Sequence, residues 1–237
     1  DITDAYEEAK NGIFNISVIA TMSSGKTTLI NSMLHKELLP SENKACTATI
    51  ARIIDNDSMT DYEVECYAED EETVIFKRTI ATPELLREYN ANENVTFINI
   101  EGNIPSTSSD KIHLCLRDTP GPNNSRNANH GRLTNSIIKE ANGIVLYVMN
   151  ATQLSIKDDE NLLKDISSEM KRRGKQSRDR FIFVLNKCDA FDVDKGETLD
   201  SVINDVRDYL AQFNIIDPII IPTSARLALI IRKDRNG

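Results

Sequence analysis

The segment from Ala20 to Thr28 combines glycine, lysine and hydroxyl residues in the spacing of a loop that binds phosphate. Its sequence lies between an apolar run and a helical pattern, so backbone N–H groups at the start of a helix can point at an anion. Gly25 permits close approach of the backbone, Lys26 adds a charge for the β- and γ-phosphate oxygens, and the Thr27 hydroxyl can bind Mg²⁺. Because Ala20 replaces the first glycine of the pattern, a chance Gly-Lys-Thr at a helix start is the alternative. The residues expected to contact a nucleotide here are Met22, Ser23, Ser24, Gly25, Lys26, Thr27 and Thr28.

A second motif, Asp118-Thr-Pro-Gly121, follows the apolar stretch Ile112–Leu116. A carboxylate at the C-terminal end of a strand can hold the hydration shell of Mg²⁺, and the Gly121 N–H is placed to reach a γ-phosphate. By itself Asp-Thr-Pro-Gly is an ordinary turn sequence. The motif therefore indicates a site for Mg²⁺ and the γ-phosphate only because a phosphate loop precedes it in the chain.

A third motif, Asn186-Lys-Cys-Asp189, follows the apolar run Phe181–Leu185 and indicates which base is bound. The Asp189 carboxylate can accept hydrogen bonds from the ring N–H and the exocyclic amine of guanine, whereas adenine would leave this acid unpaired. Discrimination of this kind can reach about 10⁴-fold. We expect Lys187 to lie along the plane of the base and Asn186 to connect this loop to the phosphate loop.

The segment Thr223-Ser224-Ala225 follows the last apolar run. Ser224 and Ala225 are placed to supply a backbone N–H to the guanine carbonyl. Taken alone, this segment is a weak signal, because serine and threonine at such positions usually cap a helix.

A switch threonine that binds Mg²⁺ and the γ-phosphate is expected on the loop after the first helix. The segment Asn43-Lys-Ala-Cys-Thr47-Ala-Thr49 offers two candidates. Position alone leaves Thr47 and Thr49 both open.

Six apolar runs predict the strands that carry these motifs, and the runs between them have helical spacing. Buried parallel strands are predicted at Ile13–Ala20, Ile144–Met149, Phe181–Leu185 and Ile219–Ile221, with further strands at Ile112–Leu116 and Ile50–Ile54. Helices are predicted over Thr27–His35, Leu133–Ala141, Asp158–Lys171 and Leu199–Phe213. We therefore predict an α/β fold, a doubly wound P-loop domain with a mostly parallel central sheet, helices on both faces and a strand-rich insertion.

The insertion is expected at about residues 55–110, within one domain spanning residues 12–237. Alternating apolar residues predict strands near Tyr62–Cys66 and Val74–Phe76, a helix start is predicted at Thr82, and Gly102–Ser109 is rich in loop-forming residues. Residues 1–11 are interpreted either as the end of an adjoining helix or as a frayed terminus.

Composition narrows the class of protein. The chain has 237 residues, 40% hydrophobic and 27% charged, so it can bury a core and is neither disordered nor fibrous. Its net charge of −9 repels nucleic acid, and we expect no nucleic-acid partner. Four scattered cysteines, no apolar run near about 20 residues and no basic signal-type N-terminus favour a cytoplasmic protein with reduced thiols. The chain lacks an initiating Met, so we expect it to be part of a longer protein.

Taken together, these motifs resemble the GTPase domain of the dynamin superfamily, in particular bacterial dynamin-like proteins. The Leu-Leu-Pro before the switch threonine and the Pro after Thr119 are more specific to this family than the phosphate loop is. The segments that carry the resemblance are Met22–Leu34, Glu37–Pro40 leading to Cys46-Thr47-Ala48, Asp118–Asn123, Asn150–Leu154 and Asn186–Asp189, within residues 13–230.

The resemblance implies that Thr47 is the switch threonine and binds the metal together with Thr27 and Asp118. It also implies a homodimer across the nucleotide face, faster GTP hydrolysis in the assembled state, and a helical stalk in the full-length protein that remodels membranes. Contact with membrane lipid would then come only from parts absent from this chain. The full-length protein would be cytoplasmic or peripheral to a membrane.

Two departures from related GTPases concern catalysis. Met22 stands where many family members have a Gln that positions the attacking water, and Pro122 follows Gly121 where small GTPases carry a catalytic Gln. Ser23 matches a family serine near the γ-phosphate or a monovalent cation, although a loop serine bonded to its own backbone explains it equally. We expect K⁺, Na⁺ or a second subunit to complete the site. Arg126 is a candidate from a partner, but a solvated surface arginine is favoured.

We predict a Mg²⁺-dependent GTPase that hydrolyses GTP to GDP and phosphate, with Lys26, Thr47 and Ser23 as catalytic residues. The alternative is a scaffold that switches between GTP and GDP states and recruits partners with little turnover, which the missing glutamines favour. A third interpretation, an ATP-using enzyme, conflicts with Asp189.

Overall fold

The computed structural model describes residues 12–20, 23–40, 49–105, 107, 113–119, 128–140, 143–154, 157–172, 178–191 and 198–236. The strands are β1 (Ile13–Ala20), β2 (Ile50–Asp55), β3 (Glu63–Tyr67), β4 (Val74–Ile80), β5 (Phe97–Gly102), β6 (His113–Asp118), β7 (Ile144–Asn150), β8 (Phe181–Asn186) and β9 (Ile219–Pro222). The helices are α2 (Lys26–Met33), α3 (Pro83–Asn90), α4 (Ala128–Lys139), α5 (Lys157–Arg172), α7 (Leu199–Ala211) and α8 (Ala225–Asn236), with a 3₁₀ turn η1 (Cys188–Ala190). No helix within these ranges is both long and apolar enough to cross a membrane.

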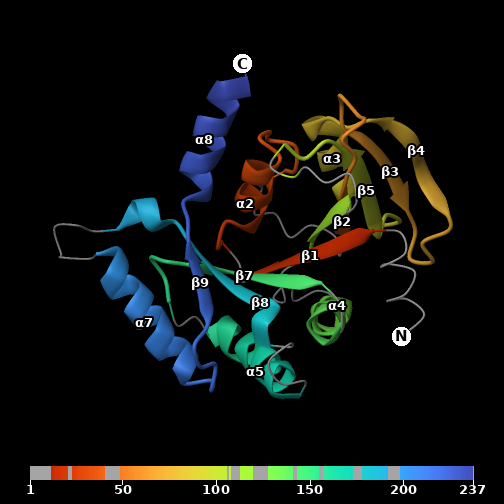
Figure 1. Cartoon of the computed structure of the whole chain (residues 1–237). Coiled ribbons are helices and arrows are strands. Elements are labelled where there is room, and N and C mark those ends of the chain that lie inside the picture. Colours follow the sequence, from red (N-terminus) through yellow and green to blue (C-terminus); the bar gives the residue numbers. More distant parts are fainter. Residues whose placement is uncertain are drawn as a thin grey trace.

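The nine strands form one sheet in the order β4-β3-β5-β2-β6-β1-β7-β8-β9 (Figure 1). Strands β6, β1, β7, β8 and β9 run parallel to one another, whereas β2 runs antiparallel to β6. The carboxyl ends of the five parallel strands therefore meet at one edge of the sheet, which is where ligands bind in folds of this type. The amino end of β2 joins this edge because β2 runs the opposite way.

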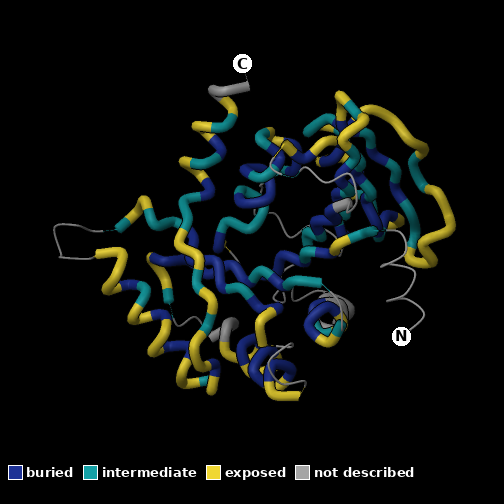
Figure 2. Tube along the Cα trace, in the orientation of Figure 1, coloured by how far each residue is buried: buried dark blue, intermediate teal, exposed yellow. Residues whose placement is uncertain are grey.

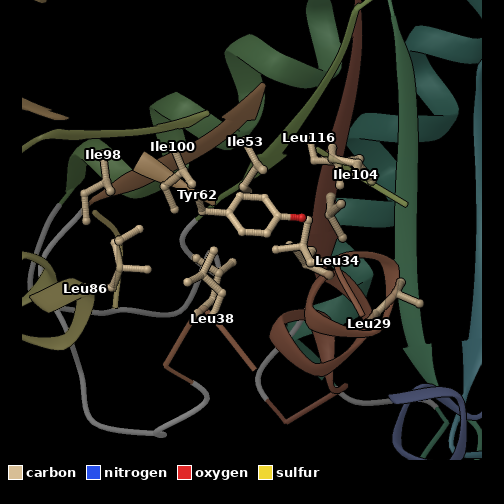
Figure 3. Packing of buried hydrophobic residues seen from close by; sticks show 14 of the residues in the cluster. Leu29, Leu34, Leu38, Ile53, Tyr62, Leu86, Ile98, Ile100, Ile104 and Leu116 are labelled. Atoms are coloured by element: carbon tan, nitrogen blue, oxygen red, sulfur yellow. The ribbon is translucent and has the colours of Figure 1, made fainter. Parts of the chain in front are cut away.

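Helices cover both faces of the sheet and enclose two hydrophobic cores. One face packs against α2, α3 and the start of α8, and Figure 3 shows Leu34, the residue after α2, in the same cluster as Ile53 and Leu116 of the sheet. The other face packs against α4, α5 and α7, which bury residues such as Leu163 against the central strands. The predicted doubly wound α/β fold with a mostly parallel sheet is confirmed.

Strands β3, β4 and β5, within the predicted insertion, extend the same sheet. Strand β3 pairs antiparallel with β4 and β5, and β5 pairs parallel with β2. Thr82 caps α3 as its position predicts, because its side chain accepts a hydrogen bond from the Leu85 N–H at 3.3 Å. Strand β5 is missing from the prediction, because only Ile98 and Ile100 mark its core face and the run ends at a glycine.

Helix α8 (Ala225–Asn236) is absent from the prediction, and two predicted elements differ in the structure. Strand β9 is predicted to be buried, yet Ile219 and Ile221 are 45% and 46% exposed, because β9 is the edge strand and the following helix α8 packs against α2 instead (Figure 2). Helix α4 begins at Ala128 rather than at Leu133.

Candidate nucleotide-binding site

The phosphate loop joins the end of β1 to α2 at the ligand edge of the sheet. Gly25 has φ +86° immediately before the helix, a left-handed conformation that glycine adopts without strain. A Cβ at this position would lie 2.5 Å from Asn186 Nδ2, so the contact between the two loops also requires glycine. Ser23 has φ +63°, and Ser24 is buried. The loop therefore has the tight backbone that a phosphate cradle requires.

Lys26 and Asp118 meet at the centre of this edge. The Lys26 ammonium forms an ion pair with the Asp118 carboxylate and donates a hydrogen bond to the Thr119 carbonyl oxygen. The two charged side chains are only 15% and 16% exposed. The Thr119 hydroxyl donates to the Val18 carbonyl at 2.8 Å, which attaches the end of β6 to β1.

Asn186 connects the loop after β8 to two other loops and is buried. Its Nδ2 donates to the Ser24 carbonyl at 2.8 Å, and its Oδ1 accepts from the Ala225 N–H at 2.9 Å. The predicted connection between Asn186 and the phosphate loop is confirmed. Because both bonds are buried, they hold the phosphate loop, the β8 loop and the start of α8 at a fixed spacing.

The residues after Asn186 turn sharply, so that the Cys188 side chain packs inward and Asp189 is exposed. Lys187 has φ +68°, and the Cys188 N–H donates to the Thr223 carbonyl at 3.1 Å. Asp189 is exposed, so its carboxylate can be reached by a base. Burial, with the nearby Asp189 charge as a smaller cause, raises the pKa of the Cys188 thiol, which therefore stays protonated at neutral pH.

The segment after β9 contributes one backbone donor. The Thr223 N–H donates to the Leu185 carbonyl, and the Ala225 N–H is occupied by Asn186. Among the hydrogen bonds of the described residues, the Ser224 N–H is the donor of this segment that is left for a ligand. Its side chain accepts from the Leu227 N–H at 3.2 Å and so caps α8.

Asn150 is a positioning residue to which the sequence analysis gave no role. It lies opposite Asn186 in the parallel β7–β8 ladder and is 7% exposed. Its Oδ1 accepts hydrogen bonds from the N–H and hydroxyl of Thr152, and the Ala151 N–H donates to the Asn186 carbonyl at 2.8 Å. The signal available in the sequence is a second asparagine at the end of the neighbouring strand.

Several predicted site residues lie outside the described residues: Met22, Thr47 and Gly121, together with Pro122 and Arg126. The structure brings together Ser24, Gly25, Lys26, Asp118, Asn186 and Ala225. Ser23, Thr27 and Thr28 flank this group in the chain.

The fold and these loops define a P-loop nucleotide-binding domain. Residues 16–188 match the model of the Dynamin family, and the chain belongs to this family. The predicted resemblance is therefore confirmed.

Known proteins similar to this chain agree with that assignment. A bacterial dynamin-like protein of Nostoc punctiforme is 38% identical over 50 residues, which is 21% of this chain and 7% of that protein. Two solved structures of an oligomerised bacterial dynamin pair, described as providing a mechanism for long-range sensing and tethering of membranes, match with TM-scores of 0.65 and 0.68 at 18% and 16% identity. Each match covers 98% of this chain but only 36% and 42% of the other chain, so this chain spans less than half of these relatives. At such identities the two structures show the shared fold.

Proposed function

We propose that this chain is a GTPase domain that binds GTP with Mg²⁺ and hydrolyses it to GDP and phosphate. The observation that carries the proposal is the buried Asn186 side chain, which bonds to the phosphate loop at Ser24 and to the start of α8 at Ala225. This connection holds the phosphate end and the base end of one nucleotide site at a constant separation. Membership of the dynamin family supports the same function.

The phosphate end of the site supplies positive charge and oxygen ligands. The N–H groups at the start of α2 and the Lys26 ammonium would bind the β- and γ-phosphates. The residues proposed to hold Mg²⁺ are Thr27, Thr47 and Asp118, and hydroxyl and carboxylate oxygens are the ligands this ion prefers. When bound, Mg²⁺ supplies neutralisation of the charge that develops on the phosphate oxygens.

The Lys26–Asp118 ion pair connects nucleotide binding to metal binding. A triphosphate offers Lys26 a stronger anion than one carboxylate, so the ammonium is expected to turn toward the phosphates. Asp118 then loses its partner at the point where a cation is needed. Nucleotide and metal therefore favour each other's binding, by the reciprocity of linked equilibria.

We expect the base end of the site to bind guanine. The Asp189 carboxylate would accept from the ring N–H and the exocyclic amine, the Ser224 N–H would donate to the ring carbonyl, and Lys187 would cover the base. Because Asp189 is exposed without a base, the bound guanine itself must exclude water from this carboxylate. Adenine would exclude the same water without supplying the two donors.

Catalysis requires a group that orients the attacking water, and the two positions where related GTPases carry a glutamine for this role are different here. Met22 and Pro122 carry no side-chain amide to orient water. We propose that Ser23 with K⁺ or Na⁺, or a second subunit in a homodimer across the nucleotide face, provides the missing stabilisation. In the full-length protein, parts outside this chain would contact membrane lipid and use the cycle to remodel membranes. A cytoplasmic or peripheral location follows from this proposal.

A GTP- and GDP-gated scaffold with little turnover is the second candidate, and the absence of both glutamines favours it. It needs the same binding site. The two functions differ in whether the protein releases phosphate faster than its Lys26→Ala variant does.

The rate of phosphate release per molecule tests the proposal. We expect this rate to rise several-fold between about 1 and about 50 µM protein with Mg²⁺ and K⁺, because dimerisation follows mass action. Replacing K⁺ with Na⁺ tests the cation, and Lys26→Ala protein at the same concentrations measures contaminating phosphatase. A flat rate equal to that of the Lys26→Ala protein, alongside tight GTP binding, would contradict hydrolysis and establish the scaffold.

A further inference from the structure

The end of the sheet formed by β3, β4 and β5 has one face that no described helix covers. Helix α3 packs on the opposite face, where Leu86 joins the core with Val64 and Ile98 of the strands. The core beneath α4, α5 and α7 contains no described residue of β2 to β5, and Figure 1 shows α5 and α7 toward the other end of the sheet. Because side chains alternate along a strand, the neighbours of Val64 and Ile98 point to the uncovered face. We call this the open face, and its hollow is lined by Glu63, Glu65, Tyr67, Arg78, Asn99 and Glu101.

The whole net charge of the chain lies in the segment that forms this end of the sheet. Residues 50–105 hold 13 of the 37 acidic residues and four of the 28 basic residues, so their net charge of −9 equals that of the entire chain. The rest of the chain is therefore balanced. An acidic surface attracts cations and repels the phosphate groups of nucleic acids and of anionic lipids. The charge thus favours a positively charged protein segment as the partner of this surface.

Carboxylates dominate the hollow on the open face, which has a volume of about 190 Å³. Glu63 lies opposite Glu101 in the antiparallel β3–β5 ladder, and like charges in this position repel. Arg78 of β4 relieves the repulsion, because its guanidinium forms ion pairs with Glu63 and, at 2.7 Å, with Glu101. Glu65 adds a third carboxylate to this single guanidinium, so the hollow remains negative.

Two acceptors in this part of the sheet have no matching positive charge or donor. The Glu65 carboxylate accepts from the Tyr67 hydroxyl at 2.6 Å but forms no ion pair within the described part of the chain. The Asn99 Oδ1, directly across from Glu65, is buried and has no hydrogen-bond partner among the described residues. The strands on both sides of Asn99, β2 and β3, are described throughout. Guanidinium and ammonium groups, which only donate, are the groups that match such acceptors.

We propose that the open face is a docking surface for an arginine- or lysine-rich segment of another protein, with one cationic side chain in the hollow. The hollow is far larger than the about 30 Å³ that one water takes, so the head of such a side chain fits. The side chains of Glu63, Arg78 and Glu101 are 33%, 48% and 31% exposed, so a partner reaches them. Neighbouring basic residues of the segment would meet the exposed carboxylates of the β3–β4 hairpin, which are Glu69, Asp70, Glu71 and Glu72.

The test titrates the protein with a fluorescein-labelled peptide in which arginine alternates with glycine, and with its glutamate counterpart. Fluorescence anisotropy gives the dissociation constants. Glu65→Gln removes a carboxylate from the hollow, and Arg78→Gln removes the guanidinium that competes with the peptide. Glu88→Gln and Arg87→Gln are the matched controls, because they change the net charge equally at exposed positions of α3, on the other face of the sheet.

We expect Glu65→Gln to weaken binding of the arginine peptide about 5-fold, the effect of one partly exposed charge pair. Arg78→Gln should strengthen binding at least about 3-fold, because Glu63 and Glu101 lose their internal partner. The two control variants should differ from wild type by less than about 1.5-fold, since exposed charges on the far face are screened. The glutamate peptide should not bind. The melting temperature of Glu65→Gln should match wild type, because the amide oxygen still accepts from Tyr67.

Three results would overturn the proposal. One is no binding of the arginine peptide to wild-type protein, and another is equal effects of the open-face variants and their controls, which would show attraction to the net charge alone. The third is self-association of the wild-type protein in sedimentation that Glu65→Gln weakens, because a second copy would then cover this face. None of these measurements includes nucleotide, so their outcome is independent of GTP binding.

Discussion

Replacing Lys26 with alanine is expected to lower GTP affinity at least about 100-fold. Two hydrogen bonds from its ammonium to phosphate, at about 1.5 kcal/mol each, sum to about 3 kcal/mol. The substitution also leaves the Asp118 carboxylate without its ion-pair partner at the place where phosphate must enter, and this repulsion adds to the loss. Titration of the purified variant with a fluorescent GTP analogue measures the effect.

Lys36→Ala is the matched control, because Lys36 is an exposed lysine beyond the other end of α2. The control should bind GTP as wild type does. The melting temperatures of both variants separate a local effect on the site from unfolding. Lys26→Ala protein that is folded and binds GTP within about 3-fold of wild type would show that the loop is not a phosphate site.

Replacing Asp189 with asparagine is expected to change which base is accepted. The amide keeps one acceptor but sets an N–H₂ group against the exocyclic amine of guanine, so GTP affinity should fall by about 10² to 10³. Xanthine has a carbonyl where guanine has that amine, so xanthosine triphosphate should gain affinity. Competition between the two nucleotides on the same protein sample measures both changes.

Asp189 is exposed, so Asp189→Asn should not alter the melting temperature. Asp208→Asn, at an exposed position of α7, controls for the loss of one negative charge. Unchanged preference for GTP over the xanthosine nucleotide would refute the role of Asp189 in base recognition.

The central strands β1, β7 and β8 were predictable because each is a short apolar run that is largely buried on both faces. Strand β9 shows the limit of this argument. Its isoleucines indicate a strand, but its position at the edge of the sheet depends on how the chain crosses over, which a local pattern does not contain. Strand β5 was missed because its alternation is short and ends in a glycine.

The parts of the candidate site that lie within one short sequence motif were predictable. Lys26, Asp118 and Asn186 each follow a predicted strand, and the structure brings all three to one edge. The connections that depend on pairing between distant strands were not visible in the sequence. The Ala225 N–H, which the sequence analysis offered to the guanine carbonyl, is instead donated to the Asn186 side chain.

The most direct test of the central claim is a calorimetric titration of the wild-type protein with GTP and, separately, with ATP, both with Mg²⁺. The account predicts that GTP binds at least about 100-fold more tightly than ATP, because only guanine satisfies the Asp189 carboxylate that it covers. Equal affinities, tighter ATP binding or no binding of GTP would contradict a guanine nucleotide site in this chain.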